Sequence, residues 1–367
     1  MKFTVQKSEM TEAVMNIQRA VSSKTSIPAL EGILLNAVNN TLELNGYDLE
    51  LGMNTIIPAT VEEEGKSVLN AKLFCEIVRK SPAEHITISV DEKNMATIES
   101  GYSNFSIVGI PPEEFPEFPK IADGTALSIS SELLKSMIRQ TIFATAESDA
   151  KPIHQGCMFN IEKGQLDVVA VDGYRLAKRT EQIEFPEDIS FVVPGKTLNE
   201  INKLIKDDQE DTKIFIGKRQ IQFKIESYTV ISSLLEGEFL NYKATIPAET
   251  TTEALVNTRE TIESVERVSL LITDRLKSPL RCTFENDTLK ILCTTSMGRA
   301  NDSINVHMDG ERLEIGFNNR YLLEALRNTE CDEVRIQMNT PLSPMKIVPK
   351  EGDSFLFLVL PVRLKNE

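Results

Sequence analysis

Basic side chains recur at a fixed interval in three eight-residue segments, residues 72–79, 196–203 and 320–327. Each segment begins and ends with Lys or Arg and carries Glu at its fifth position, and successive segments start 124 residues apart (196 − 72 and 320 − 196). On an α-helix the first, fifth and eighth residues share one face, and the apolar residues of these segments lie opposite. Each segment therefore predicts a helix that packs through its apolar face and presents cations, which bind phosphate groups, on the other.

Two interpretations of these helices stay open. In the first, the basic residues and the Glu of each helix pair on a solvated face, which contributes only roughly 0.2–0.5 kcal/mol per pair. In the second, the three faces line a concave surface that contacts a phosphate backbone, and the recurrence of the pattern at identical positions favours it. Basic residues on or near the other predicted helices would extend this surface: Arg19, Lys24, Lys135, Arg139, Lys206 and Arg267.

The sequence lacks the residue combinations that are typical of catalysis. Its three histidines, His85, His154 and His307, are far apart, and none has a cysteine at metal-ligand spacing. No glycine-rich phosphate loop and no Gly-x-Ser-x-Gly motif occur. We therefore expect a protein that is not an enzyme and has no metal and no cofactor. An acidic hydrolase, the alternative, would need a polar cluster confined to one repeat, and we find none.

Composition limits the class of protein further. Because phosphates repel acidic surfaces, a nucleic-acid binder with a formal net charge of −15 must segregate its Lys and Arg residues. The longest apolar runs, such as residues 355–360, are too short to cross a bilayer, so no membrane association is expected. The five cysteines form no close pair, which favours core thiols in a reducing cytoplasm.

The elements that must hold these helices are repeated as well. A further helix is predicted in each repeat, capped by Ser8 in the first, by Ser131 in the second, and by a capping box of Thr250 and Glu253 in the third. The first of these would bury Met10, Ala13, Val14 and Ile17.

Alternating apolar residues in segments such as 85–90 and 213–216 predict antiparallel strands. Several strands with only two helices in each repeat predict an α+β fold, with the helices gathered on one side of the sheets. Proline-rich joints divide the chain into three modules, at residues 1–120, 121–246 and 247–367.

Two other segments could bind a partner. Residues 171–177 interrupt a strand with Asp-Gly, which can form a turn that exposes the following Tyr and Leu, although an ordinary strand connection is equally compatible. Residues 355–364 stay apolar almost to the C-terminus. A buried last strand explains residues 355–359 well and residues 360–364 less well, and an exposed apolar groove for a partner peptide is the alternative for residues 360–364.

Six short motifs follow this triple repeat in order along the chain. They are residues 1–5 (MKFTV), 26–30 (SIPAL), 48–50 (DLE), 172–177 (DGYRLA), 316–318 (GFN) with Tyr321 and Leu322, and 360–364 (LPVRL). Together they resemble the motifs of the bacterial beta sliding clamps of DNA polymerase III. Each motif alone is weak, but six in register with a triple repeat, over essentially the whole chain, are specific.

The resemblance implies a head-to-tail homodimer whose six modules close a ring around double-stranded DNA, with helices lining the hole and antiparallel sheets outside. Such a clamp is a processivity factor that makes no bonds in DNA. By analogy with the family, the DNA-facing residues are Lys24, Lys72, Arg79 and Lys196, and the repeat adds Lys203 and Arg320. Ring closure would join Phe105 and Ile107 to Leu271 and Ile272, although core packing explains these residues equally well from sequence alone.

The resemblance also implies a groove between the second and third modules that takes short peptides from the DNA polymerase III catalytic subunit, the clamp loader, other polymerases and repair proteins. The matching residues are His154, Val171, Gly173, Tyr174, Arg175, Leu176, Leu240, Ala244, Thr245, Pro344, Leu358, Leu360, Pro361, Val362 and Arg363. His154 stands where Leu is common, Leu240 where Pro is common and Ala244 where Arg is common, and residues 365–367 extend beyond the usual end. The peptide preference of the groove therefore stays open.

Overall fold

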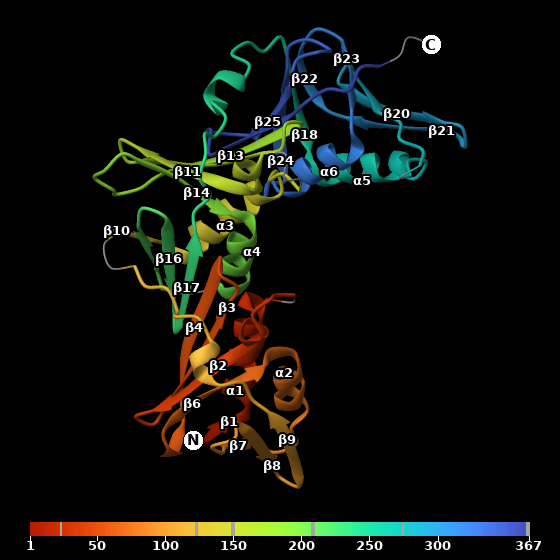
Figure 1. The fold of residues 1–367 in the computed structure, drawn as a ribbon. Coiled ribbons are helices and arrows are strands. Elements are labelled where there is room, and N and C mark those ends of the chain that lie inside the picture. The colour runs from red at the N-terminus through yellow and green to blue at the C-terminus, as the bar shows by residue number, and fades with distance from the viewer. Residues whose placement is uncertain (23, 122–123, 148–150, 207–209, 274, 365–367) are drawn as a thin grey trace. The chain divides into compact units, whose positions relative to one another are not determined.

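The computed structural model describes residues 1–367 except 23, 122–123, 148–150, 207–209, 274 and 365–367. Residues 365–367, which extend beyond the usual end of the family, thus lie outside the described residues. The chain divides into two compact units, Met1–Leu134 with Glu200–Leu234, and Lys135–Asn199 with Leu235–Glu367. Figure 1 shows the helices and strands of both.

The three segments with basic ends form helices, as predicted: α2 (Ala71–Lys80), α4 (Gly195–Leu204) and α6 (Asn319–Arg327). Asparagine side chains cap two of them. Asn70 accepts a hydrogen bond from the Leu73 amide at 3.1 Å, and Asn318 accepts one from the Arg320 amide at 2.9 Å. Such caps satisfy amide groups that have no partner within the first turn of a helix.

The apolar face of α2 is buried through Phe74, Ile77 and Val78, as predicted. Leu73, which was predicted to join them, is instead 48% exposed. It follows Lys72 directly, and one residue turns a helix by only about 100°, so Leu73 lies at the border between the two faces.

The other three described α-helices are α1 (Lys7–Ile17), α3 (Ser131–Ile142) and α5 (Thr258–Ser269). Helix α1 buries Met10, Ala13, Val14 and Ile17, as predicted. Its N-cap position is Gln6 rather than Ser8, and no side chain caps it. Short 3₁₀ segments are η1 (Gln18–Ala20), η2 (Pro28–Glu31), η3 (Pro112–Glu114), η4 (Pro152–Gln155) and η5 (Tyr242–Thr245).

The predicted capping box of Thr250 and Glu253 is wrong. Strand β18 (Thr252–Asn257) occupies this region, with buried residues alternating along it. The side chain of Asn257 caps the helix that follows, accepting a hydrogen bond from the Glu260 amide at 3.0 Å. The Thr-x-x-Glu spacing was therefore misleading, because a strand with period-two burial already accounted for the apolar residues.

The first unit contains two antiparallel sheets. The five-stranded sheet has the order β5 (Thr60–Glu63), β1 (Lys2–Gln6), β7 (His85–Val90), β8 (Met95–Ser100), β9 (Ser103–Val108). The eight-stranded sheet has the order β10 (Thr125–Ile129), β15 (Thr212–Ile216), β16 (Gln220–Ile225), β17 (Tyr228–Ser233), β4 (Leu51–Pro58), β3 (Thr41–Tyr47), β2 (Gly32–Val38), β6 (Gly65–Asn70). The strands predicted at residues 85–90 and 213–216 are thus confirmed.

The second unit also contains two antiparallel sheets. The nine-stranded sheet has the order β14 (Ile189–Pro194), β11 (Gly156–Glu162), β12 (Gln165–Val171), β13 (Arg175–Gln182), β26 (Phe355–Val359), β25 (Met345–Pro349), β24 (Glu333–Met338), β18, β22 (His307–Gly310). The four-stranded sheet has the order β21 (Gly298–Asn305), β20 (Thr288–Thr295), β19 (Leu280–Glu285), β23 (Leu313–Phe317).

Helices and sheets are segregated within each unit. In the first, α1 packs on α2 and against β3 and β4; in the second, α5 packs on α6 and against β20 and β21. Figure 1 shows these helix pairs together on one side of their strands. The α+β prediction is therefore confirmed, and the segregation leaves one face of each helix pair free of sheet.

Cysteine burial agrees with a core role for the thiols. Cys75, Cys157, Cys282 and Cys293 are buried, and none of the described cysteines forms a disulfide. Burial raises the pKa of Cys75, Cys157 and Cys282 to about 12, so these thiols stay protonated and unreactive. Among the described residues, no helix is long and apolar enough to cross a membrane, and no His, Cys, Asp and Glu side chains gather in threes that could hold a metal ion.

Candidate functional site

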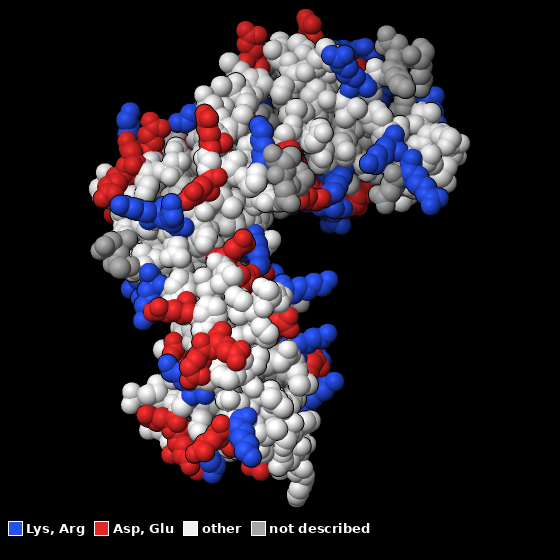
Figure 2. Space-filling view, in the orientation of Figure 1, with Lys and Arg blue, Asp and Glu red and all other residues white. Residues whose placement is uncertain are grey.

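The side chains predicted to bind phosphate are all exposed, and five of the six lie on the repeated helices. Helix α2 carries Lys72 and Arg79, α4 carries Lys196 and Lys203, and α6 carries Arg320, while Lys24 follows η1. Figure 2 shows Lys and Arg side chains projecting on the side of the first unit where α1 and α2 lie, with Asp and Glu mainly over its strands.

Each repeated helix pairs its Glu with a basic residue of its own. Both guanidinium–carboxylate distances between Arg79 and Glu76 are 2.8 Å, Lys203 Nζ lies 2.7 Å from Glu200 Oε1, and Arg320 Nε lies 2.9 Å from Glu324 Oε1. The two interpretations of the helices are therefore compatible, because the cations remain exposed while they are paired. The Arg79–Glu76 pair is solvent-exposed on both sides, and such pairs are weak and can exchange a carboxylate for a phosphate.

Most of the neighbouring basic residues are ion-paired too. The pairs are Arg19 with Glu200, Lys206 with Glu12, Arg139 with Glu330 and Arg267 with Asp302. By contrast, neither Lys24 nor Lys72 forms an ion pair with a carboxylate within the described ranges. The helix faces thus combine a few unpaired cations with many that are partly neutralised.

Glu324 connects the helix face to a second predicted site. Arg175 is 4% exposed; its Nε donates to Asp172 Oδ2 at 2.9 Å, and its guanidinium also donates to Glu324. Arg320 donates to the same Glu324 and to Glu147. Burial acts to raise the pKa of Glu324, but the hydrogen bonds from the two arginines outweigh it and lower that pKa. The carboxylate is therefore ionised at neutral pH and shared by both sites.

The predicted peptide groove has a buried apolar floor. Val171, Leu176 and Leu358 belong to one hydrophobic cluster with residues of β11, β12, β14 and η5. They come from three adjacent strands, because β12 pairs with β13 and β13 pairs with β26, which places Leu176 opposite both Val171 and Leu358. The sheet register thus brings together groove residues that lie more than 180 positions apart (358 − 171).

Exposed apolar side chains stand at the edge of this floor. Tyr174 is 61% exposed, and Leu360 and Val362 are each 38% exposed. Gly173 has a φ of 90°, which glycine adopts without strain. The Leu360 amide donates to the Tyr174 carbonyl at 2.9 Å, and this bond holds the segment after β26 against the turn before β13. Large exposed apolar residues on a rigid backbone are typical of a peptide-binding surface.

His154, in η4, is 8% exposed and packs edge-on against Phe239 with ring centroids 5.3 Å apart. Burial, and then the charge of Lys151, lowers the pKa of His154, so the ring is neutral at pH 7. It can therefore replace an apolar residue in the groove wall.

The remaining groove residues lie around the floor without joining its buried cluster. Ala244 and Thr245 are exposed on η5, and Leu240 is 37% exposed just before it. Pro344, in the loop between β24 and β25, and Pro361 are half-buried, and Arg363 is exposed.

Family comparisons agree with this architecture in all three modules. Models of the N-terminal, central and C-terminal domains of the DNA polymerase III beta subunit match residues 1–119, 128–241 and 243–363. The beta sliding clamp of Bacillus subtilis is 34% identical over 376 residues, which cover 99% of this chain and 100% of the relative. The chain belongs to the beta sliding clamp family.

Solved sliding clamps share the fold closely. The Bacillus subtilis clamp superposes with a TM-score of 0.96 at 32% identity, covering 100% of both chains. A DNA polymerase III beta subunit from Eubacterium rectale gives 0.94 at 34% identity, covering 99% of both. Sliding clamps are accessory subunits that tether a polymerase to DNA. The prediction of a non-catalytic processivity factor is therefore confirmed by family membership.

Sequence reasoning missed several residues that shape the groove of this clamp chain. Tyr321 stacks on Tyr174 with ring centroids 5.8 Å apart and lies 4.8 Å from the Arg175 guanidinium. Tyr242, in η5, donates to the buried Asp167 carboxylate at 2.7 Å. Burial, and then this hydrogen bond, raises the pKa of Tyr242. Tyr321 was noted only as part of a family motif, because its contact with Tyr174 depends on the fold.

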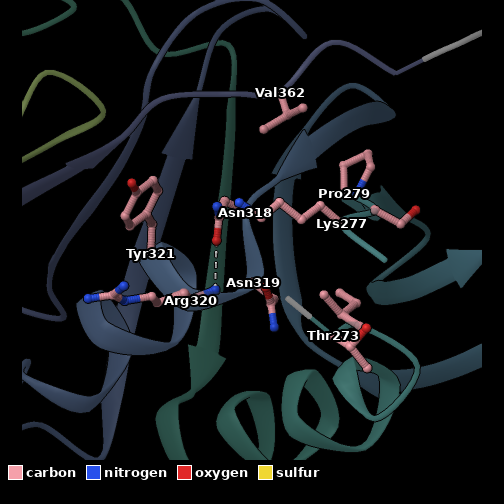
Figure 3. Close-up of a pocket in the computed structure, with 10 residues that line it drawn as sticks. Thr273, Lys277, Pro279, Asn318, Asn319, Arg320, Tyr321 and Val362 are labelled. Atoms are coloured by element: carbon pink, nitrogen blue, oxygen red, sulfur yellow. Dashed lines mark hydrogen bonds between the residues drawn. The ribbon is translucent and has the colours of Figure 1, made fainter. Parts of the chain in front are cut away.

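A cavity of 490 Å³ in the C-terminal module of the clamp chain overlaps the predicted groove only at Val362 (Figure 3). Figure 3 shows Tyr321 and Arg320 on its α6 side and Lys277 and Pro279 on the other. It is polar where the groove floor is apolar. This cavity is therefore a separate feature from the buried apolar cluster beneath the predicted groove.

The residues predicted to close the clamp are accessible in the single chain. Phe105 is 38% exposed and Ile107 half-buried on β9, which is the edge strand of its sheet. Leu271 and Ile272 are half-buried just after α5. Val108 and Leu270 were not predicted, yet they are 71% and 81% exposed. An exposed apolar edge strand readily pairs with another chain.

Proposed function

We propose that two copies of this chain close head to tail into a ring, and that Lys24, Lys72, Arg79, Lys196, Lys203 and Arg320 face the duplex inside it. The observation that carries this proposal is the exposed basic face repeated on α2, α4 and α6 at one fixed interval, in a chain of the sliding clamp family. Nothing in such a face reads bases, so any duplex sequence would be accepted.

The charge arrangement suits a ring that slides. Phosphate contacts exchange through counterions, and each costs little to break in water. The Glu residues paired with Arg79, Lys203 and Arg320 compete with phosphate and keep each contact weak. Retention on DNA then comes from topology rather than from affinity.

Ring closure is assigned to β9 of one copy and the segment after α5 of the other. Phe105 and Ile107 offer apolar side chains beside unpaired backbone groups of an edge strand, and Leu271 and Ile272 offer the complementary apolar patch. A heterologous contact of this kind closes when the second copy returns to the first.

The groove is assigned to short apolar peptides of the partners. These are the DNA polymerase III catalytic subunit, the clamp loader, and other polymerases and repair proteins, all acting in the cytoplasm. Leu360, Val362 and Tyr174 would contact the peptide, and the cluster of Val171, Leu176 and Leu358 supports them. Apolar side chains on a rigid backbone bind without a large ordering cost.

Retention on DNA tests the proposal. Lys72, Lys196 and Arg320 changed together to Glu should shorten the residence time on nicked circular DNA by at least about tenfold, because three phosphate contacts become repulsive. The residence time is measured at low salt from the fluorescence of labelled protein that stays on surface-bound DNA. The wild-type chain should leave linear DNA unless the ends are blocked, whereas a scaffold that binds only proteins would ignore DNA in both forms.

A matched control makes the same change in net charge with three Lys→Glu substitutions outside the helices. Lys66, Lys163 and Lys290 are exposed on strands or strand connections, one in each module, and their triple change to Glu should leave residence unaltered. Equal loss in both triple variants would show that net charge, rather than the helix face, holds the duplex.

Molecular mass in solution tests ring closure separately. Changing Leu271 and Ile272 to Ala removes apolar area from the proposed contact and should shift the wild-type dimer toward a species with the mass of one chain. Sedimentation measures the mass, and unaltered circular dichroism shows that the monomer is folded. A variant that stays dimeric would place the contact elsewhere.

A further inference from the structure

One turn sets the backbone frame of the peptide groove in the second unit. Asp172 Oδ1 accepts hydrogen bonds from the amides of Tyr174 at 2.9 Å and Arg175 at 3.1 Å, and Gly173 between them has positive φ. The Leu360 amide, just after β26, donates to the Tyr174 carbonyl. The turn, the end of the paired strand and the η5 segment together frame the groove.

The first unit repeats this frame 124 residues earlier (172 − 48). Asp48 Oδ1 accepts from the amides of Glu50 at 3.0 Å and Leu51 at 2.7 Å, and Leu49 has a φ of 79°. The Ser233 amide, at the end of β17, donates to the Glu50 carbonyl at 2.9 Å. The paired strands β4 and β17 of Figure 1 correspond to β13 and β26. The backbone plan of the groove therefore occurs twice in the chain.

A cavity of 570 Å³ lies at this second position, and its lining is basic. Ser233 belongs both to the repeated frame and to the cavity, and the turn between β15 and β16 forms the opposite wall. The Leu234 amide donates to the Arg219 carbonyl at 2.8 Å and ties that wall to the frame. The charged side chains of the lining are Lys120, Lys218 and Arg219.

Two of these cations are available to a ligand. Lys120 and Lys218 are exposed, and neither forms an ion pair with a carboxylate in the described part of the chain. Arg219 already interacts within the protein, so recognition is assigned to the two lysines. In a chain with a net charge of −15, a cavity whose charged lining residues are all basic stands apart from the acidic surface as a whole.

The apolar space at this position is filled by the chain itself. The Phe118 ring lies 6.2 Å from the Tyr47 ring, and a Cβ at Gly52 would come within 2.9 Å of Phe118. Gly52 lies opposite Ile231, two residues before Ser233. An apolar side chain of a ligand therefore finds no vacancy beneath the cavity, and charge is left as the means of recognition.

We propose that this basic cavity is a second docking site of the clamp chain, which takes an acidic, extended segment of a partner protein. The frame matches the one assigned to peptides in the second unit, and the three cations complement acidic side chains. Glu50 stands on the framing turn and would repel a continuous phosphate chain. A peptide can place an uncharged residue there and its carboxylates beside Lys120 and Lys218.

Fluorescence polarisation with labelled decapeptides tests the site on the full chain. A peptide alternating Glu and Ser should bind with a Kd below about 1 mM, weaken as salt rises, and bind at least about tenfold more weakly to Lys120→Glu/Lys218→Glu. The matched variant Lys66→Glu/Lys93→Glu, with the same charge change on exposed residues of the first unit, should bind like wild type. Leu360→Ala/Val362→Ala should also bind normally, because the site is separate from the groove.

Three results would overturn the proposal. They are an acidic peptide that does not bind at about 1 mM, a ten-nucleotide thymidine strand that binds more tightly than the peptide through the same lysines, and equal binding by the two lysine double variants. Lys120→Gln/Lys218→Gln should give intermediate affinity, which excludes misfolding as the cause. None of these measurements depends on DNA retention, so the failure of this site and the failure of the clamp function are distinguishable.

Discussion

On helices α2 and α6 the side chains proposed to bind DNA are exposed to solvent, whereas those proposed to bind peptides lie over a buried apolar cluster. Lys72 and Arg320 are exposed and belong to long, flexible side chains, but Leu176 and Leu358 are almost fully buried. Contacts of the first kind are interchangeable and screened by salt. Contacts of the second kind depend on one geometry. A protein that must move along one partner and hold another needs both.

The two regions meet at one carboxylate. Glu324 accepts from Arg320 on the exposed face of α6 and from Arg175 beside the groove. Exposure separates the two arginines: the Arg175 side chain is 4% exposed and the Arg320 side chain 57% exposed. Substituting Arg175 and Arg320 separately therefore tests the effect of burial, because Glu324 accepts from both side chains.

The largest effect is expected from Arg175→Ala. It leaves Asp172 and Glu324 without a buried partner, and breaking such a pair costs about 3–5 kcal/mol. Hydrogen exchange of the β13 and α6 amides measures the local loss of stability. Arg320→Ala, the matched control, should cost less than about 1 kcal/mol because the Arg320 side chain is itself solvent-exposed. Similar losses in both variants would remove the distinction between the two regions.

The next effect sharpens the groove side of the comparison. Changing Leu360 and Val362 to Ala removes exposed apolar area and should weaken binding of a polymerase peptide by about tenfold, which corresponds to about 1.4 kcal/mol. Calorimetry measures the affinity, and the fold should be unaffected because neither side chain is buried. Met297→Ala, which removes a side chain that is 68% exposed outside the groove, is the control. An unchanged affinity would exclude Leu360 and Val362 from the site.

The helix faces could be predicted from the sequence, but the link between the regions could not. The basic ends and apolar positions of residues 72–79 repeat with helical spacing, and that pattern is local. In the third copy, Glu324 has the same spacing from Arg320 and looks like an ordinary partner within the helix. Its second partner, Arg175, lies 149 residues away (324 − 175), and only the fold brings them together.

The apolar C-terminal segment suggested a groove, but most of the predicted groove residues came from the family resemblance rather than from periodicity. Buried strand residues such as Val171 and Leu358 look the same in a sequence whether they support a binding surface or only a core. The error at Thr250 and Glu253 has a similar origin, since a cap motif and a strand start can share the same residues. Tertiary packing decides between such alternatives, and a local sequence pattern does not show which distant residue each side chain contacts.

The smallest effect concerns His154 and gives the groove a pH dependence just below neutrality, whereas the carboxylates with lowered pKa values on the helix faces, Glu76 and Glu324, titrate in acid. Because burial lowers the pKa of His154 in the folded chain, the unfolded chain binds more protons below its ordinary pKa of about 6.5. Stability is therefore complete above that pH and decreases as pH falls from it toward the lower pKa of the folded chain. Hydrogen exchange of β11 and η4 amides at a series of pH values measures this loss.

His154→Leu should abolish this part of the pH dependence while keeping the groove apolar, and Lys72→Leu, a control on the helix face, should leave it intact. An identical pH profile in wild type and His154→Leu would show that titration of the ring is not coupled to folding.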